Sequence, residues 1–337
     1  MKNTTTRRGF IKQVAATGVG LTIGGMSFKA SSAKSYANIM GSNERVNMAV
    51  MGTNGRGAGM ARNFQSRKDV EMRYVCDVEE KALAKGVAAV KKAGGNPKTE
   101  KDIRKVLADK NIDAILVTAP DHWHAPATIM ACQAGKHVYC EKPCSHNPHE
   151  GELSLAAARK YNRVVQVGAQ RRSWPGLTEG IEALHNGVIG KVHFAKAWYT
   201  NNRKSIGFGK EMPAPSTIDF DLWQGPAPRR SYRDNLIHYN WHWFWHWGTG
   251  EALNNGTHEI DVVRWGLGLD FPTAVSSEGG RFRYKDDWET PDTQTIDIRF
   301  GDDCLVTWEG RSCNSRDTEG RDRGVIFYGE GGALETG

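Results

Sequence analysis

The sequence predicts an α/β protein whose N-terminal half folds around a doubly wound parallel sheet. From residue 45 onward, short apolar runs alternate with amphipathic stretches of helical length, the pattern of consecutive βαβ units. A glycine-rich turn follows the first apolar run, and an aspartate ends the second run. We therefore predict a dinucleotide-binding domain over residues 45–168 and a second domain over residues 169–337.

The alternation places each element in turn along the chain. Strands of the first domain are predicted over residues 46–51, 72–76, 114–118, 137–140 and 164–167, and helices over residues 58–66, 79–93, 102–109, 125–134 and 148–161. In the second domain, helices are predicted over residues 178–186 and 258–267, and strands over residues 192–200, 273–283, 293–300, 304–310 and 325–328. Residues 201–239 are rich in proline and polar residues, so they are predicted to run over the surface.

The first turn of this pattern predicts a site for a dinucleotide. Its sequence is GTNGRG at residues 52–57, in which Asn54 replaces the middle glycine of G-x-G-x-x-G. The carboxylate at the end of the second strand favours NAD, because it accepts hydrogen bonds from the ribose hydroxyls and repels a 2′-phosphate. The expected cofactor contacts are Gly52, Asn54, Gly55, Arg56, Gly57 and Asp77. NADP stays possible because Arg56 and Arg73 lie nearby in the sequence, and a glycine turn that binds nothing is the simplest alternative.

The first 37 residues have the layout of a cleaved export signal. A basic start containing TRRGFIK at residues 6–12 precedes a short apolar run and then small residues, and cleavage is expected after Ala33 or Ala37. The arginine pair predicts export of the folded protein by the twin-arginine machinery to the periplasm, with an ordinary secretion signal as the alternative. No later segment is long and apolar enough to anchor the mature chain in a membrane. Removing residues 1–37 lowers the formal net charge from +7 to +1, so the charge gives no support to nucleic-acid binding.

Three further motifs carry a family resemblance. They are APDHWH at residues 119–124, Glu-Lys-Pro at residues 141–143, and GTGEALNNGTHEID at residues 248–261. Together with the glycine-rich turn, they resemble the Gfo/Idh/MocA oxidoreductases, named for glucose-fructose oxidoreductase and inositol dehydrogenase. The resemblance covers residues 46 to about 335.

The resemblance implies a Rossmann domain followed by an α/β domain with a large open, mostly antiparallel sheet. That sheet faces the nicotinamide and often forms an oligomer interface, so a homo-oligomer is expected. Related chains usually continue beyond the position of Gly337, so the second domain is expected to be truncated. The cofactor contacts that the resemblance adds are Pro120, His122, His124, Glu141 and Lys142.

The resemblance also implies the reacting groups, Lys142 and His258. The lysine contacts the reacting hydroxyl, and the peptide before Pro143 is often cis, while the histidine is the usual acid/base. These residue types suit the oxidation of an alcohol, because His titrates near neutral pH and a lysine beside it stabilises a developing alkoxide. Many relatives have Asp at the position of Asn254; an amide can hold a hydroxyl but cannot act as a base.

An aromatic stretch, HYNWHWFWHW at residues 238–247, precedes the histidine motif. Some of these side chains must be core, but indole rings also stack on sugar rings. His242 and His246 are four residues apart, yet no glutamate completes a zinc motif and the cysteines form no CxxC pair, so no metal is expected. The expected substrate contacts are Tyr239, Trp241, His242, Asn254 and Arg171.

These expectations combine into one functional hypothesis with two alternatives. We expect a periplasmic NAD(P)-dependent oxidoreductase that acts on a hydroxyl of a sugar or glycoside. Because NAD is made in the cytoplasm, an exported enzyme would keep its nucleotide and return it to its starting state in each cycle. One alternative is an NAD-dependent glycosidase that works by transient oxidation and elimination. The other is a sugar- or nucleotide-binding module without catalysis.

Overall fold

The computed structural model describes residues 45–301 and 303–336. The predicted export signal over residues 1–37 lies outside the described residues. Within the described ranges, no helix is long and apolar enough to cross a membrane.

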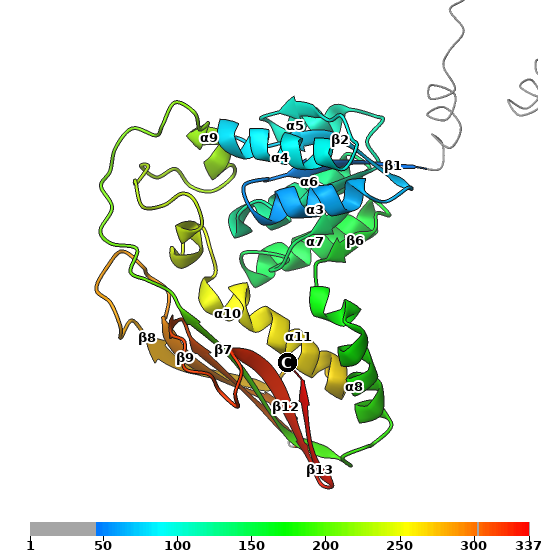
Figure 1. Ribbon diagram of the computed structural model, residues 1–337, viewed down its shortest axis with the longest axis vertical. Coiled ribbons are helices and arrows are strands. Elements are labelled where there is room, and N and C mark those ends of the chain that lie inside the picture. The colour runs from blue at the N-terminus through cyan, green and yellow to red at the C-terminus, as the bar shows by residue number, and fades with distance from the viewer. Residues whose placement is uncertain (1–44, 302, 337) are drawn as a thin grey trace, which may run out of the picture. The chain divides into compact units, whose positions relative to one another are not determined.

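The first domain contains the doubly wound parallel sheet that the alternation predicts (Figure 1). Its strand order is β3-β2-β1-β4-β5-β6, and each neighbouring pair is parallel. This is the order of Rossmann folds. The strands are β1 (Val46–Met51), β2 (Val70–Cys76), β3 (Lys98–Glu100), β4 (Ala114–Val117), β5 (His137–Cys140) and β6 (Val165–Val167). The helices are α3 (Arg56–Gln65), α4 (Glu80–Lys92), α5 (Ile103–Ala108), α6 (Asp121–Gln133) and α7 (Pro148–Lys160).

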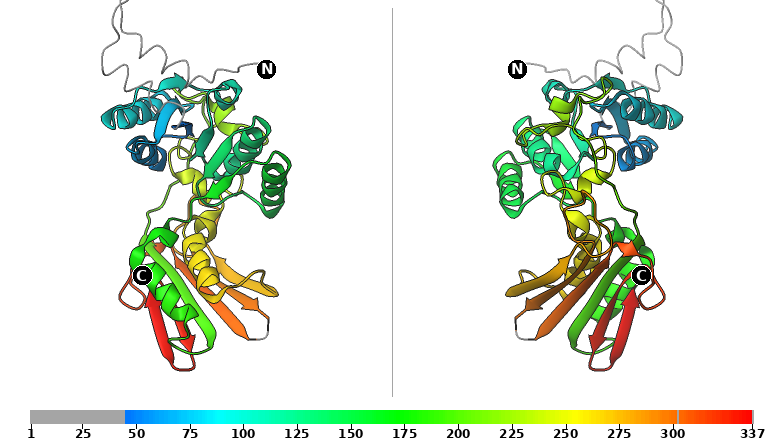
Figure 2. Two further views of the ribbon diagram at one scale, coloured as in Figure 1. Left: turned by 90° about the vertical axis from the view of Figure 1, so that its right-hand side faces the viewer. Right: turned by 90° about the vertical axis from the view of Figure 1, so that its left-hand side faces the viewer.

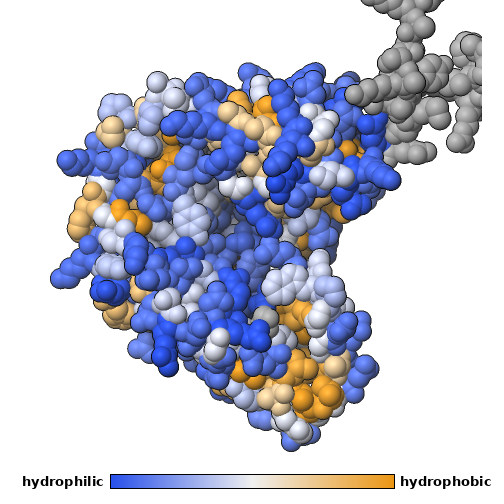
Figure 3. Space-filling model, viewed as in Figure 1, coloured by the Kyte–Doolittle hydropathy of each residue, from blue (hydrophilic) through white to orange (hydrophobic). Residues whose placement is uncertain are grey.

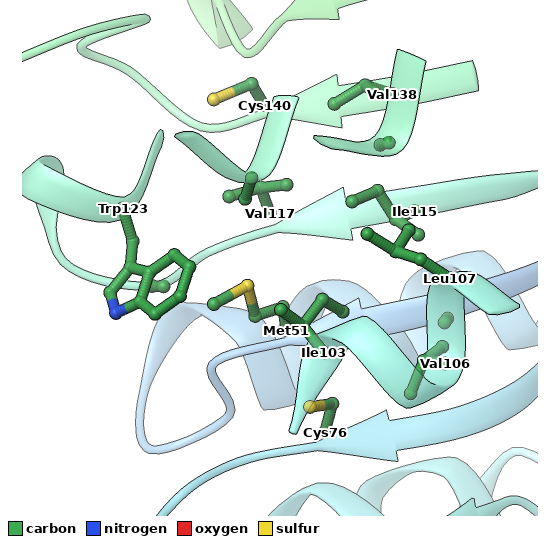
Figure 4. Close-up of a cluster of buried hydrophobic side chains, with 14 of the residues drawn as sticks. Met51, Cys76, Ile103, Val106, Leu107, Ile115, Val117, Trp123, Val138 and Cys140 are labelled. Carbon is green, nitrogen blue, oxygen red and sulfur yellow. The ribbon is translucent and has the colours of Figure 1, made fainter. Parts of the chain in front are cut away.

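Helices cover both faces of this sheet, because its central strands are apolar on both sides. All four residues of β4 are buried. One core joins the sheet to α5, α6 and α7, and Figure 4 shows Ile103, Val106 and Leu107 of α5 against the strands. The other core joins the opposite face to α3 and α4. Trp123 belongs to the first of these cores, the one that contains α5, α6 and α7, and Figure 4 shows it beside Met51, the last residue of β1.

The second domain is a mostly antiparallel sheet with helices on one face (Figure 2). Its strand order is β13-β12-β7-β10-β9-β8, and only β7 and β10 pair in parallel. The strands are β7 (Val192–Asn202), β8 (Ala274–Gly280), β9 (Thr293–Phe300), β10 (Cys304–Arg311), β12 (Arg323–Gly329) and β13 (Gly332–Thr336), with the short β11 (Cys313–Asn314) beside β7. The helices are α8 (Pro175–His185), α10 (Gly250–Asn254) and α11 (Gly256–Leu267). In Figure 3, hydrophobic colour gathers at the end of this domain where α8 and β13 lie.

Three sequence predictions of local structure need correction. Helix α6 begins at Asp121 instead of residue 125, so the DHWH residues form its first turns and Asp121 lies at the favourable end of the helix dipole. Strands β3 and β13 were not predicted, because both are short edge strands with largely exposed, polar or small residues.

The third correction concerns residues 201–239, which do not simply follow the surface. They leave β7, return to the first domain and form α9 (Phe220–Gln224), which lies beside α4 (Figure 1). Trp223 and Leu236 of this segment are buried in one cluster with Phe244 and Trp247. The apolar side chains that anchor the segment are spaced irregularly, so no periodic pattern in the sequence predicted that it packs against the first domain.

Candidate functional site

A cavity of about 390 Å³ lies where the parallel strands end. Met51 and Cys76 close β1 and β2 there, and Thr118 and Glu141 directly follow β4 and β5. Ligands of open α/β sheets bind at this edge. Its walls also include Gly52, Thr53, Asn54, Gly55, Arg56, Asp77, Pro120, Asp121, His124, Lys142, Gln170, Ile218, Trp223, Ile237, His238, Tyr239, Trp241, His242, Asn254 and His258.

The glycine-rich turn lies at one end of this cavity. Gly52 has φ +88°, and a Cβ there would come within 2.7 Å of the Ala119 nitrogen. Gly57 does not line the cavity; a Cβ on it would lie 1.8 Å from the Gly52 oxygen, so this glycine permits close packing of helix and strand. The structure gives Gly57 a role in the packing of the turn, and its predicted contact with the cofactor stays a prediction.

Asn54 is held by a residue that the sequence analysis missed. The Lys85 Nζ donates hydrogen bonds to the Asn54 carbonyl oxygen at 2.5 Å and to its Oδ1 at 3.0 Å. Positive φ in this turn falls on Gly52, and Asn54 is not among the residues with positive φ. The amide thus replaces the middle glycine without left-handed backbone. No local motif marks Lys85, because it reaches the turn from α4.

The start of α3 fits the phosphates of a dinucleotide. Gly55 is the N-cap residue, it offers no side-chain cap, and the first turn contains no acidic residue. Space beside Gly55 is open, since an added Cβ would meet no atom within 4 Å. The uncapped N–H groups and the helix dipole therefore favour an anion here.

Asp77 fits the adenosine ribose of NAD. It lines the cavity, and it is held in place by the Thr53 N–H, which donates to Oδ2 at 2.6 Å, and by the Glu79 N–H, which donates to Oδ1 at 3.0 Å. Arg73 donates to Asn47 and pairs with Glu71, and it does not line the cavity. The sequence argument that Arg73 leaves room for NADP is therefore wrong.

Lys142 and His258 meet in the wall of the cavity, although 116 positions separate them in the chain. The Lys142 Nζ donates to the Asn254 carbonyl oxygen at 2.5 Å and to Asn254 Oδ1 at 3.0 Å. Burial lowers the pKa of Lys142. Burial, followed by the charges of Lys142 and Arg323, lowers the pKa of His258 to about 3. The imidazole is therefore neutral and able to accept a proton, and the Lys142–Pro143 peptide is cis.

Glu141 joins the glycine-rich turn to the loop after β6. The Arg56 Nε donates to Glu141 Oε1 at 3.2 Å, and a second guanidinium nitrogen donates to Gln170 Oε1. These three residues and Pro120 line the cavity as neighbours of Lys142 in the wall. Nothing in the local sequence marks Gln170, which the fold brings in from beyond β6.

The two histidines of the DHWH motif are mainly structural. His122 does not line the cavity, which corrects its predicted cofactor role. It is buried between the rings of Trp223 and Trp247, and its Nε2 donates to the Trp223 carbonyl oxygen at 2.9 Å. His124 does reach the cavity wall, but its ring nitrogens lie against the carbonyl oxygens of Pro143 and Ala119. It supports the Glu-Lys-Pro loop.

The aromatic stretch divides between cavity and core. Tyr239, Trp241 and His242 line the cavity as predicted. The Nδ1 of His242 lies 2.6 Å from the Tyr239 carbonyl oxygen, and burial lowers the histidine's pKa to about 4. Because a carbonyl only accepts, the proton of the neutral ring sits on Nδ1 and Nε2 is left as an acceptor. Trp243 instead stacks on Trp288 in a buried cluster, with ring centroids 4.0 Å apart.

Arg171 does not line the cavity described above, nor a second cavity that is described below, which corrects its predicted substrate role. It is 3% exposed, and its Nη1 lies 3.1 Å from Glu259 Oε1. Its neighbour Arg172 reaches a second cavity instead, where it forms a bidentate pair with Asp261 at 2.7 and 2.8 Å. Both arginines occur in one turn of 3₁₀ helix, so only one of them can turn toward this cavity.

This second cavity, of about 280 Å³, shares Lys142 and His258 with the first. Its remaining walls are Gln166, Val167, Gly168, Ala169, Arg172, Thr257 and Asp261. Lys142 and His258 thus line two spaces, one that reaches the glycine-rich turn and one whose polar side chains include Arg172, Thr257 and Asp261. In residues 45–301 and 303–336, no cluster of three or more His, Cys, Asp or Glu could hold a metal ion.

Comparison with known proteins matches both domains. Residues 46–169 match the oxidoreductase family with an NAD-binding Rossmann fold, and residues 189–328 match the C-terminal α/β domain of the same oxidoreductase family. The chain is 30% identical over 173 residues to a myo-inositol 2-dehydrogenase of Thermotoga maritima, covering 51% of this chain and 47% of the relative. It is 26% identical over 257 residues to a glycosyl hydrolase family 109 protein of Stenotrophomonas maltophilia, covering 70% and 56%.

The chain spans about half the length of these curated relatives. Among solved structures, it resembles a myo-inositol dehydrogenase from Lactobacillus casei in complex with NAD(H) and myo-inositol, with a TM-score of 0.65 and 20% identity. That alignment covers 87% of this chain and 74% of the other, and it shows a shared fold.

Proposed function

This chain belongs to the Gfo/Idh/MocA oxidoreductase family, and from that premise we propose that it oxidises a hydroxyl group of a sugar or glycoside with NAD. One observation carries the proposal. Lys142, fixed by two hydrogen bonds to Asn254, and the neutral His258 stand together in a wall that two cavities share.

The chemistry of this pair suits an alcohol. Oxidation of a carbinol removes a hydride from carbon and a proton from oxygen, and NAD, when bound, accepts the hydride. Burial and nearby cations lower the pKa of His258 to about 3, so its ring is neutral at physiological pH and has a nitrogen free to take the hydroxyl proton. The ammonium of Lys142 stabilises negative charge on the substrate oxygen as that proton leaves.

The first cavity offers groups that suit both the cofactor and the sugar ring, and the second cavity adds polar side chains beside the reacting pair. The first contains the groups that fit NAD, namely the open α3 terminus and Asp77. The second is lined by Arg172, Asp261 and Thr257, whose side chains pair naturally with hydroxyl groups. Tyr239 and Trp241 add aromatic surface to the first cavity near His242, which suits the apolar face of a sugar ring.

We also propose that the nucleotide is held tightly. Residues 215–238, here called the strap, return from the second domain to the loop that follows Asp77. The Glu80 N–H donates to the Thr217 carbonyl oxygen at 3.1 Å, and the Asp219 N–H donates to that of Val78 at 3.0 Å. His238 Nε2 lies 2.9 Å from Glu79 Oε2. Four strap residues line the cavity, namely Ile218, Trp223, Ile237 and His238.

A strap across this edge supports retention, because the dinucleotide could leave only after these contacts open. Retention would in turn suit a protein exported with its cofactor. The motif at residues 6–12 supports the proposal that the protein is sent folded to the periplasm by the twin-arginine machinery. Cell fractionation tests this: the wild-type protein should appear in the periplasm, and the double variant Arg7→Lys with Arg8→Lys should stay in the cytoplasm.

The open face of the second sheet supports a further proposal, that the chain forms a homo-oligomer. Helices α8 and α11 cover one face (Figure 2). Strand β8 is exposed along almost its whole length, and Val275 is 57% exposed. Light scattering on the purified protein would test the assembly state.

Net glycoside hydrolysis is the second candidate, favoured by the similarity to glycosyl hydrolase family 109 over 70% of this chain. In such a reaction the sugar is oxidised transiently, the glycosidic group is eliminated, water adds, and the sugar is reduced again. Incubation with α- and β-linked aryl glycosides separates the two candidates. Net oxidation by a retained nucleotide forms at most one NADH for each chain, or an oxidised sugar together with a reduced second sugar, and releases no aglycone, whereas hydrolysis releases aglycone without net NADH. If a panel of sugars, polyols and aryl glycosides, offered singly and in pairs, gives no oxidised sugar, no reduction of the bound nucleotide and no aglycone, both enzyme proposals fail and a binding module remains.

A further inference from the structure

Glu251 lies behind the reacting lysine, buried in the second domain. Its carboxylate is 3% exposed and accepts hydrogen bonds at both oxygens. The Arg203 Nε donates to Oε2 at 2.6 Å, and the Ser312 hydroxyl donates to the same oxygen at 3.2 Å. The Asn254 Nδ2 donates to Oε1 at 3.2 Å, and the side-chain amide of Asn255 also donates to Oε1.

This arrangement determines the direction of the Asn254 amide. An ionised carboxylate accepts hydrogen bonds and cannot donate them, so Asn254 must turn its NH₂ group to Glu251. The amide oxygen then faces the other way, where it accepts from Lys142 Nζ at 3.0 Å. Lysine only donates, so both contacts require the same amide orientation. Asn254 is 6% exposed, which leaves water little access to either contact.

The charges around Lys142 come from several elements. The carboxylates facing it are Asp121 of α6, Glu141 of its own loop and Glu251 of α10, and the cation is Arg56 of α3. The rings of His258 and His242 lie in the same cavity wall. Only Glu251 acts on Lys142 through a hydrogen-bonded side chain as well as through its charge.

We propose that Glu251 is the positioning residue of the site: it orients the Asn254 amide and so fixes the place and the reactivity of the Lys142 amine. The proposal rests on the proposed function only in treating Lys142 as a reacting group. Sequence reasoning did not find this residue, because its partners Arg203, Asn254 and Ser312 come from three separate segments.

The test measures Lys142 directly and needs no substrate. The full chain, purified with whatever nucleotide it holds, is labelled with trace acetic anhydride across a range of pH. Peptide mass spectrometry then reports acetylation of Lys142 relative to the exposed Lys210 as an internal reference. The amine reacts only when unprotonated, so labelling reports both its pKa and its access.

Glu251→Gln should speed Lys142 labelling roughly three- to tenfold near pH 8, because an amide at this position can donate and no longer forces the Asn254 orientation. Asn254→Asp in the wild-type background should slow it, since a second carboxylate stands beside the ammonium. The double variant Glu251→Gln with Asn254→Asp should bring labelling back to the wild-type rate or below it. In the double variant, the new amide at position 251 donates to the new carboxylate at position 254, and that carboxylate also accepts from Lys142.

A matched control removes another buried carboxylate that pairs with arginine. Asp292 is 1% exposed and lies 3.0 Å from Arg281 in the same domain, so Asp292→Asn should leave Lys142 labelling unchanged. Glu251→Gln could unfold the chain because it leaves the charge of Arg203 without its carboxylate partner, so Glu251→Asp is the second variant. It keeps the charge that faces Arg203 and withdraws the carboxylate from Asn254, and it should also speed labelling.

Wild-type labelling of Lys142 in folded Glu251→Gln or in Glu251→Asp would overturn the proposal and leave Glu251 as a partner of Arg203 only. Circular dichroism and thermal melting establish folding in each case. The outcome is separate from that of the proposed function. A wild-type protein that turns over no sugar would refute the function without altering the labelling result.

Discussion

The glycine-rich turn at residues 52–57 and the aromatic stretch at residues 238–247 face one cavity but are built in different ways. The turn is made of backbone, and its glycines are needed where a Cβ would strike the Ala119 nitrogen or the Gly52 oxygen. The aromatic stretch is made of side chains, of which Tyr239, Trp241 and His242 reach the cavity while Trp243, Phe244 and Trp247 fill the core. Local geometry thus determines the first region, and tertiary packing determines the second.

The largest expected effect on turnover comes from Lys142, which lines the same cavity as both regions. Lys142→Met should reduce turnover by about 10²–10⁴-fold, because the substrate oxygen loses its cationic partner. The amount of bound nucleotide should change little. Steady-state kinetics with the substrate found in the panel, together with nucleotide content, provide the measurement. Turnover within a few-fold of wild type would remove Lys142 from the chemistry.

The backbone character of the turn is tested by two glycines of α3. Gly57→Ala should destabilise the fold by about 3 kcal/mol or more and abolish nucleotide binding, because the new Cβ would lie 1.8 Å from the Gly52 oxygen. Gly59→Ala is the matched control: a Cβ there meets no atom within 4 Å, so stability should rise by up to about 1 kcal/mol. Urea unfolding and nucleotide content report both. Equal behaviour of the two variants would contradict the account of the turn.

Acid stability should depend on three histidines with lowered pKa values, of which His242 lies in the aromatic stretch and His122 and His258 lie in α6 and α11. Burial lowers the pKa of His122 and His242 to about 4, and burial with nearby cations lowers that of His258 to about 3. In the unfolded chain each binds its proton near pH 6.5. The unfolded state therefore binds more protons between these values, and the free energy of unfolding falls as pH drops from 6.5 toward 4.

The slope should approach about 1.4 kcal/mol per pH unit for each histidine. Urea unfolding at several pH values measures it, and His122→Asn should reduce the loss by roughly a third. A pH dependence of His122→Asn equal to that of wild type would show that the His122 ring is not buried as a neutral group. The comparison of the two proteins is needed because burial raises the pKa of Glu259 to about 7, which opposes the effect of the histidines.

The smallest expected effect is on KM, and it compares a tryptophan of the aromatic stretch that lines the cavity with one that is exposed on the surface. Trp241→Leu should raise KM about tenfold, in line with about 1.4 kcal/mol for a lost stacking contact. Trp245 is 55% exposed and does not line the cavity, so Trp245→Leu should leave KM within about twofold. A similar KM for both variants would mean that the stretch does not contact substrate.

The difference between the two regions also explains how far sequence reasoning reached. Gly52, Asp77, Lys142 and His258 could be placed in one site because short motifs fix each of them beside a strand or at a helix. His122 and Arg171 looked equally suitable in sequence, yet His122 packs between two tryptophans and Arg171 pairs with Glu259. Whether a side chain faces the cavity or the core depends on how the chain packs around it.

Residues that act through long-range contacts gave no signal at all. Lys85 reaches Asn54 from the next helix, and Glu251, although only three residues from Asn254 in α10, is held by Arg203, which directly follows β7. The strap is the largest example. Its composition predicts a surface loop, but its buried tryptophan anchors it over the edge of the first domain.

The central claim is that this family member keeps NAD within its cavity for a redox cycle on a sugar. The most direct test is to purify the protein, dialyse it extensively, denature it and identify the released nucleotide by mass spectrometry. The account predicts about one NAD or NADH for each chain, as expected if the contacts of the strap slow the release of the dinucleotide. Protein that releases no dinucleotide would contradict the account, since neither retention nor an internal redox cycle could then operate.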